Sequence, residues 1–197
     1  MTYDLLLPLV AFAFVAIATP GPNNLMLLAS GANFGVRRAI PHMFGIMFGH
    51  AGMLIVLGLG LGNVFELYPT LKTILKVLSV SYMLYLAWKI ATSTAPKAVS
   101  GDAKPLTLMQ AAVFQWVNPK AVATALTAVT VYAPDQSYLV IFTVALVFIS
   151  VSLPSVSVWT ILGQQMQKIL TNERRLRTFN ITMAVLLVAS LYSVVTF

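Results

Sequence analysis

Thr19-Pro20-Gly21-Pro22-Asn23-Asn24 is a polar, proline-rich stretch in the middle of the first apolar run of the chain, residues 5–32. Its two prolines remove two backbone N–H donors, and the glycine between them makes the backbone more flexible. Unpaired backbone groups are costly in hydrocarbon, so a spanning helix breaks only where the break is buried in protein or lines a cavity. The stretch therefore predicts half of a solute-binding site at the membrane midplane.

The composition indicates an integral membrane protein. Of the 197 residues, 59% are hydrophobic and only 9% are charged, with a mean hydropathy of +0.88, whereas a soluble domain has roughly 25% charged residues. The net charge is +7, but the basic residues occur in short loops, which favours membrane topology over nucleic-acid binding. There is no cysteine, which excludes disulfides and thiolate metal sites.

The hydropathy pattern predicts an all-α protein with six spanning helices, each containing about 20 apolar residues. The first run has no basic residue before it and is too long for a signal peptide, so we expect a retained helix. The predicted spans are Leu5–Ala32, Ala39–Gly62, Thr70–Ala91, Leu106–Val131, Tyr138–Leu162 and Thr178–Thr196.

The distribution of basic residues supports this count. Nine of them fall in or beside the first, third and fifth loops, and positive residues mark the cytoplasmic side. Both termini are therefore predicted to be periplasmic. A count of five or seven spans would instead place the basic loops on both sides of the membrane. The nine are Arg37, Arg38, Lys89, Lys97, Lys104, Lys168, Arg174, Arg175 and Arg177.

The chain is predicted to be a single transmembrane domain built from two inverted three-helix repeats. Residues 1–95 would form the first repeat, residues 96–104 a cytoplasmic linker, and residues 105–197 the second repeat. An odd number of spans in each half makes the halves opposite in orientation, and both halves have a proline break in their first span, at Pro20/Pro22 and at Pro119. Matching breaks of this kind mark the binding site of many transporters.

Lys120 is the only charge near the centre of a predicted span, and such a residue is a functional candidate because its insertion is costly. It would bind a substrate carboxylate; alternatively, it only caps carbonyls freed by Pro119 or reaches water in a cavity. Asn118 precedes this proline, and Gln115 lies one turn earlier and would face the same cavity. The breaks could also be simple proline kinks, but their matching positions beside Asn residues favour function.

Two further residues are candidates with open alternatives. His50 lies near the middle of the second span and is a coupling candidate, since its ordinary pKa is near neutrality; the alternative is a hydrogen-bonded packing histidine. Tyr82 on the third span lines the cavity or packs in the core. His42, by contrast, is expected at the cytoplasmic interface.

The sequence lacks the residues that other classes of function require. No span contains an acidic residue, which argues against a carboxylate Na⁺ site or proton relay within the membrane. There is no P-loop, no metal-spaced His cluster and no acid/base pair, so we expect neither an enzyme nor a cofactor or metal. A membrane-embedded enzyme, a non-transporting scaffold and a channel remain the alternatives to a transporter.

Several motifs together resemble the LysE/RhtB family of small amino-acid exporters, and the similarity covers nearly the whole chain. The motifs are Pro20-Gly21-Pro22-Asn23, Gly35-Val36-Arg37-Arg38, Gly45 with Gly49, Tyr82-Met83-Leu84-Tyr85-Leu86 and Asn118-Pro119-Lys120. The resemblance implies proton-driven efflux of amino acids or their derivatives across a bacterial inner membrane, and a homodimer. Residues 86–92 and Val158-Trp159 look most like the cysteine/O-acetylserine exporter branch.

The chain departs from the family pattern in two places. Ser79 and Ala87 stand where the family usually has Gly, and residues 130–134 replace a usual Leu-Pro-Gln-Phe stretch. These departures bear on helix contacts around the third span and on substrate preference. Within this frame, Asn23, Asn24 and Asn118 are predicted to bind the polar groups of the solute, and Lys120 its carboxylate.

Overall fold

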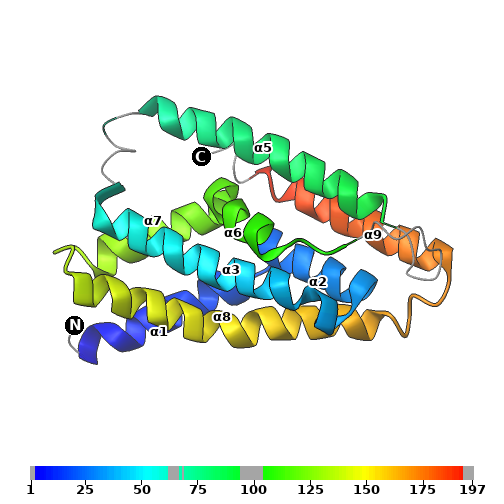
Figure 1. Ribbon diagram of the computed structural model, residues 1–197, viewed down its shortest axis with the longest axis horizontal. Coiled ribbons are helices and arrows are strands. Elements are labelled where there is room, and N and C mark those ends of the chain that lie inside the picture. Colours follow the sequence, from blue (N-terminus) through cyan, green and yellow to red (C-terminus); the bar gives the residue numbers. More distant parts are fainter. Residues whose placement is uncertain (1–2, 62–66, 68, 94–103, 193–197) are drawn as a thin grey trace.

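The computed structural model describes residues 3–61, 67, 69–93 and 104–192, and within these ranges every regular element is a helix (Figure 1). The predicted linker, residues 96–104, lies outside the described residues except for Lys104. The elements are α1 (Tyr3–Ala18), α2 (Pro22–Phe34), α3 (Val36–Val56), the π-helical turn η1 (Leu57–Leu61), α5 (Pro69–Ala91), α6 (Leu108–Val117), α7 (Pro119–Tyr132), α8 (Tyr138–Met166) and α9 (Glu173–Ala189).

The helices confirm a multi-pass membrane protein. Among the described residues, three helices are long and apolar enough to cross a membrane: Val36–Leu61, Thr73–Ala91 and Tyr138–Met166. A fourth crossing results if α1 and α2, which meet at a bend of 54°, act as one broken span. The pair α6–α7 and the helix α9 correspond in position to the fourth and sixth predicted spans, so the six-span arrangement stays a prediction.

Both predicted helix breaks are present. Gly21 before α2 is extended, with φ −173° and ψ −178°, and Pro22 is the first residue of the new helix. Asn118 before α7 is extended as well, with φ −89° and ψ 106°, and Pro119 begins that helix. Proline favours the first position of a helix and forces the residue before it out of the helical conformation, so each break follows from local sequence chemistry.

Helices of each half pack mainly against helices of the other half. The broken pair α1–α2 packs on α8, while α6 packs on α3, and α5 packs on α9 (Figure 1). Small residues permit the close crossings. Gly31 and Gly163 lie against backbone atoms of α8 and α2 respectively, and Gly45 and Gly49 lie against α6.

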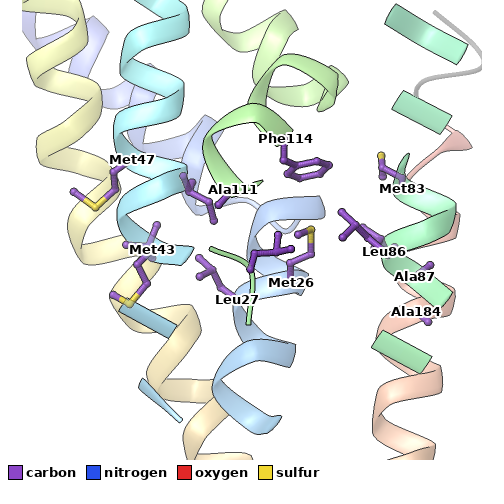
Figure 2. Packing of buried hydrophobic residues seen from close by; sticks show 14 of the residues in the cluster. Met26, Leu27, Met43, Met47, Met83, Leu86, Ala87, Ala111, Phe114 and Ala184 are labelled. Carbon is purple, nitrogen blue, oxygen red and sulfur yellow. The ribbon is translucent and has the colours of Figure 1, made fainter. Parts of the chain in front are cut away.

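Two apolar clusters fill the space between these helices. One joins α1, α3, α7 and α8 around Phe148 and Leu54. The other joins α2, α3, α5, α6, α8 and α9, and Figure 2 shows Phe114 and Met26 opposite Met83 and Leu86 of α5. The polar break region therefore lies between apolar layers rather than at an end of the molecule.

Gly163→Val is expected to destabilise the protein strongly, because a Cβ at this position would meet the backbone of Leu28. Overpacking against backbone costs about 2 kcal/mol or more, which corresponds to a fall of roughly 4–8 °C in the thermal unfolding midpoint. Gly52→Val is the matched control, since nothing lies within 4 Å of a Cβ built there. Equal midpoints for the two variants in detergent would contradict this α2–α8 crossing.

Candidate functional site

The first break exposes backbone carbonyls that side chains from other helices satisfy. Asn24 Nδ2 donates to the carbonyl oxygens of Ile17 at 2.8 Å and of Thr19 at 2.9 Å. Lys120 Nζ, from the other half of the chain, donates to the same Thr19 carbonyl at 2.7 Å. The Thr19 hydroxyl donates back to Val15 within α1. The end of α1 is thus held by groups that belong to α2 and α7.

The two breaks are also joined by a reciprocal amide pair. Asn23 Nδ2 donates to Gln115 Oε1 at 2.9 Å, and Gln115 Nε2 donates to Asn23 Oδ1 at 3.2 Å and to the Ala111 carbonyl at 2.9 Å. Gln115 is fully buried. Because 92 residues separate the partners, the pair fixes the start of α2 against the end of α6.

A small polar cavity lies between the breaks. It has a volume of about 40 Å³, room for about three waters at 10–15 Å³ each. Five helices and both breaks contribute to its wall, in which polar groups are interspersed with a larger apolar surface. The lining residues are Ala16, Ile17, Gly21, Pro22, Asn23, Asn24, Ile46, His50, Asn118, Lys120, Ala121, Thr124, Ser152 and Val156.

Two buried polar atoms in this wall have no hydrogen-bond partner among the described residues. They are Oδ1 of Asn118 and Nε2 of His50, and the residues are only 2% and 6% exposed. The His50 ring packs edge-on against Phe148 at 5.3 Å. Most buried polar atoms in native proteins are paired, so these two are candidate partners for a solute or water that enters the site. The His50 side chain also interacts with the backbone of Ala121.

Gly21 allows Lys120 to reach this position. A Cβ on Gly21 would lie 2.9 Å from Cδ and 3.2 Å from Nζ of Lys120. The backbone of the first break thus leaves room for a cation in the cavity wall. The cavity offers a positive charge, an amide oxygen, an imidazole nitrogen and, at Pro22, the start of a helix whose first N–H groups favour an anion.

Most of the residues predicted from sequence come together here. Seven line the cavity: Gly21, Pro22, Asn23, Asn24, His50, Asn118 and Lys120. Gln115 lies behind the wall, and Thr19 contributes its carbonyl oxygen. Pro20 is exposed, and Pro119 begins α7 without lining the cavity.

Tyr82 lies elsewhere. Its ring packs against Phe114 at 5.7 Å and Tyr85 at 6.0 Å, beside the apolar cluster around Phe114, so the packing alternative describes its position. Sequence reasoning missed two polar lining residues, Thr124 and Ser152. Thr124 lies one helical turn after Lys120, which is a spacing that could have identified it.

No metal site accompanies the cavity: across residues 3–61, 67, 69–93 and 104–192, no group of three or more His, Asp or Glu side chains could bind one ion. An all-helical, multi-pass protein with two broken helices around a buried polar cavity has the architecture of a membrane transporter. The family described as LysE type translocator matches residues 14–190 of the chain. The chain belongs to this family, which is one of transporters rather than enzymes.

Its relatives include the proteins named cysteine/O-acetylserine efflux protein of Escherichia coli (strain K12) and Shigella sonnei (strain Ss046). Each is 30% identical over 197 aligned residues, which cover 95% of this chain and 96% of the relative. No solved structure matches the chain at a significant level.

Proposed function

We propose that the protein is a secondary active exporter of amino acids or small amino-acid derivatives, driven by the proton gradient across a bacterial inner membrane. The observation that carries this proposal is the cavity at which Lys120, Asn118 and His50 meet between two helix breaks. Family membership and the printed function of the efflux relatives support the same class of solute. Cysteine and O-acetylserine are therefore the first solutes to test.

The cavity is chemically suited to a zwitterion. The ammonium group of Lys120 and the start of α2 attract a carboxylate, whereas the unpaired Oδ1 of Asn118 accepts from a substrate ammonium group. In the present arrangement Lys120 donates to Thr19 instead. Binding would exchange this contact for the carboxylate, and the end of α1 would lose one of its ties to α7.

Alternating access would follow from this exchange. The packing of each broken helix pair on the second helix of the other half supports an inverted repeat, in which one half rocks against the other around the cavity. The cavity holds only about three waters, which indicates that the substrate enters through a wider conformation.

The orientation proposed is the one that places basic turns in the cytoplasm. The start of α3, the end of α5 and the α8–α9 turn lie toward the same end of the molecule (Figure 1). In or beside these segments are Arg37, Arg38, Lys89, Lys168 and Arg174. Both termini would then be periplasmic. A homodimer, implied by the family resemblance, completes the proposal.

The test is loss of labelled amino acids from preloaded proteoliposomes, with and without an imposed proton gradient. Saturable loss of one amino-acid class that depends on the gradient is expected. Flux without saturation would favour a channel. Absence of flux for every amino acid, in protein shown to be folded, would contradict export and reopen the enzyme and scaffold alternatives.

His50→Gln is expected to separate transport from its driving force. Glutamine keeps a polar side chain in the cavity but cannot titrate near neutral pH. The variant should transport down a substrate gradient at near wild-type rate, while an imposed proton gradient no longer accelerates it. An unchanged response to the proton gradient in the same vesicles would remove His50 from coupling and leave it a packing residue.

A further inference from the structure

A second and larger cavity lies outside the break region. Its volume is about 450 Å³, and it is bordered by α2, the start of α3, the end of α5 and residues 104–106 and open on one side. These segments belong to the basic end of the molecule, which the proposed orientation places in the cytoplasm. A cavity of this size falls in the range of small-molecule sites, whereas the break cavity is an order of magnitude smaller.

A buried histidine belongs to the wall of this cavity. His42 is only 1% exposed; its Nδ1 lies 3.0 Å from the Ser30 hydroxyl, and its Nε2 has no hydrogen-bond partner among the described residues. Ser93 Oγ, in the same wall, is buried and equally unpartnered. Two orphaned polar atoms in one wall indicate a polar ligand, because such atoms are usually satisfied.

The charged residues of the wall indicate which kind of ligand the cavity would bind. Lys89 and Lys104 line the cavity, and among the described lining residues none is acidic. The remaining wall is largely apolar and aromatic, with Met26, Leu86 and Trp88. This combination suits a small molecule with a carboxylate and a modest side chain, for which lysine and imidazole donate to the carboxylate.

An apolar layer separates the two cavities. Met26 and Leu86 line the large cavity, Ile46 and Val156 line the break cavity, and all four belong to the cluster around Phe114 (Figure 2). The same apolar cluster thus contributes side chains to the walls of both cavities.

We propose that the large cavity is a second amino-acid site, at which a carboxylate-bearing substrate binds from the cytoplasm before it reaches the breaks. The site rests on the proposed export function for its role, but its binding of a carboxylate can be measured separately. His42 and Lys89 bind the carboxylate, and Trp88 contacts the side chain.

Trp88 provides the measurement. In a Trp116→Phe/Trp159→Phe background it is the only tryptophan, and it lies in the wall of this cavity with 64% of its surface exposed. The protein in nanodiscs is titrated with L-cysteine, O-acetyl-L-serine, L-threonine and L-leucine, each compared with its carboxamide. At least one amino acid should change the emission saturably, and its carboxamide should bind at least ten times more weakly.

Variants then test whether the change in Trp88 fluorescence comes from binding in this cavity. His42→Leu and Lys89→Met are each expected to weaken binding at least tenfold, and Lys168→Met, which alters a lysine outside the lining, should leave it unchanged. Lys89→Met keeps the test valid if His42→Leu fails to fold. Equal binding of acid and carboxamide, or unchanged binding in Lys89→Met, would overturn the proposal.

The two proposals fail in different ways. Lys120→Met in the same background should lose export and keep the Trp88 response. A response without export by the unmutated reporter protein would reject the proposed function and retain the site. Export without any Trp88 response to the exported amino acid would reject the site and retain the function.

Discussion

Lys120→Met is expected to abolish amino-acid export while the protein still folds and inserts. Among the described residues of the cavity wall, Lys120 is the only charged one and is the group proposed to bind the substrate carboxylate; methionine removes this charge but keeps an unbranched chain of similar length. The lost hydrogen bond to Thr19 costs about 1.5–3 kcal/mol, and relief from holding a charge at membrane depth offsets part of this. Asn24 continues to donate to the same carbonyl.

The control is Lys168→Met, since Lys168 is exposed and lies outside both cavities. Initial efflux rates from proteoliposomes with matched protein content should fall at least 100-fold for Lys120→Met and stay near wild type for Lys168→Met. Undiminished export by Lys120→Met would leave Lys120 with a capping role only.

Asn118→Leu is expected to fold normally and to fail in transport. Its Oδ1 is buried and unpartnered, so the change to leucine, a side chain of similar size, removes an unsatisfied acceptor from the wall and should alter stability by less than about 1 kcal/mol. The substrate would lose the proposed acceptor of its ammonium group. We expect at least a tenfold loss of efflux at a low substrate concentration.

Asn180→Leu supplies the contrast. Asn180 is fully buried and fully used: it donates to Asn33 Oδ1 at 3.1 Å and to the Ser93 carbonyl at 2.9 Å, and it accepts from Asn33 Nδ2 at 2.8 Å. Its loss leaves partners unsatisfied and should lower the free energy of unfolding by about 2–3 kcal/mol. Equal thermal midpoints for the two Asn→Leu variants would contradict this assignment of paired and unpaired amides.

The helix breaks were predictable from sequence because proline acts locally. Pro22 and Pro119 fix where a helix begins, whatever surrounds them. The candidate site residues could be proposed from these breaks, since the predicted spans contain no acidic residue and few other polar groups lie near the breaks. The pairing of Asn23 with Gln115 and the contact of Lys120 with Thr19 could not be predicted, because each depends on how distant helices pack.

Helical periodicity identifies which residues share one face of a helix, but not which other helix that face packs against. Tyr82 could line the cavity or pack in the core, and only the position of α5 against Phe114 decides this. His42 shows the same limit: its place near the cytoplasmic end was readable from the sequence and stays a prediction, whereas its burial beside Ser30 arises from the packing of α2 on α3.

The central claim is that a solute crosses through alternating access at the breaks, and counterflow measures this most directly. Vesicles loaded with an unlabelled amino acid are diluted into a trace of the labelled form, without any ion gradient. An exporter of the proposed kind should accumulate the label transiently above its external concentration, and Lys120→Met should not. Simple equilibration of the label without an overshoot would contradict the account and indicate a channel.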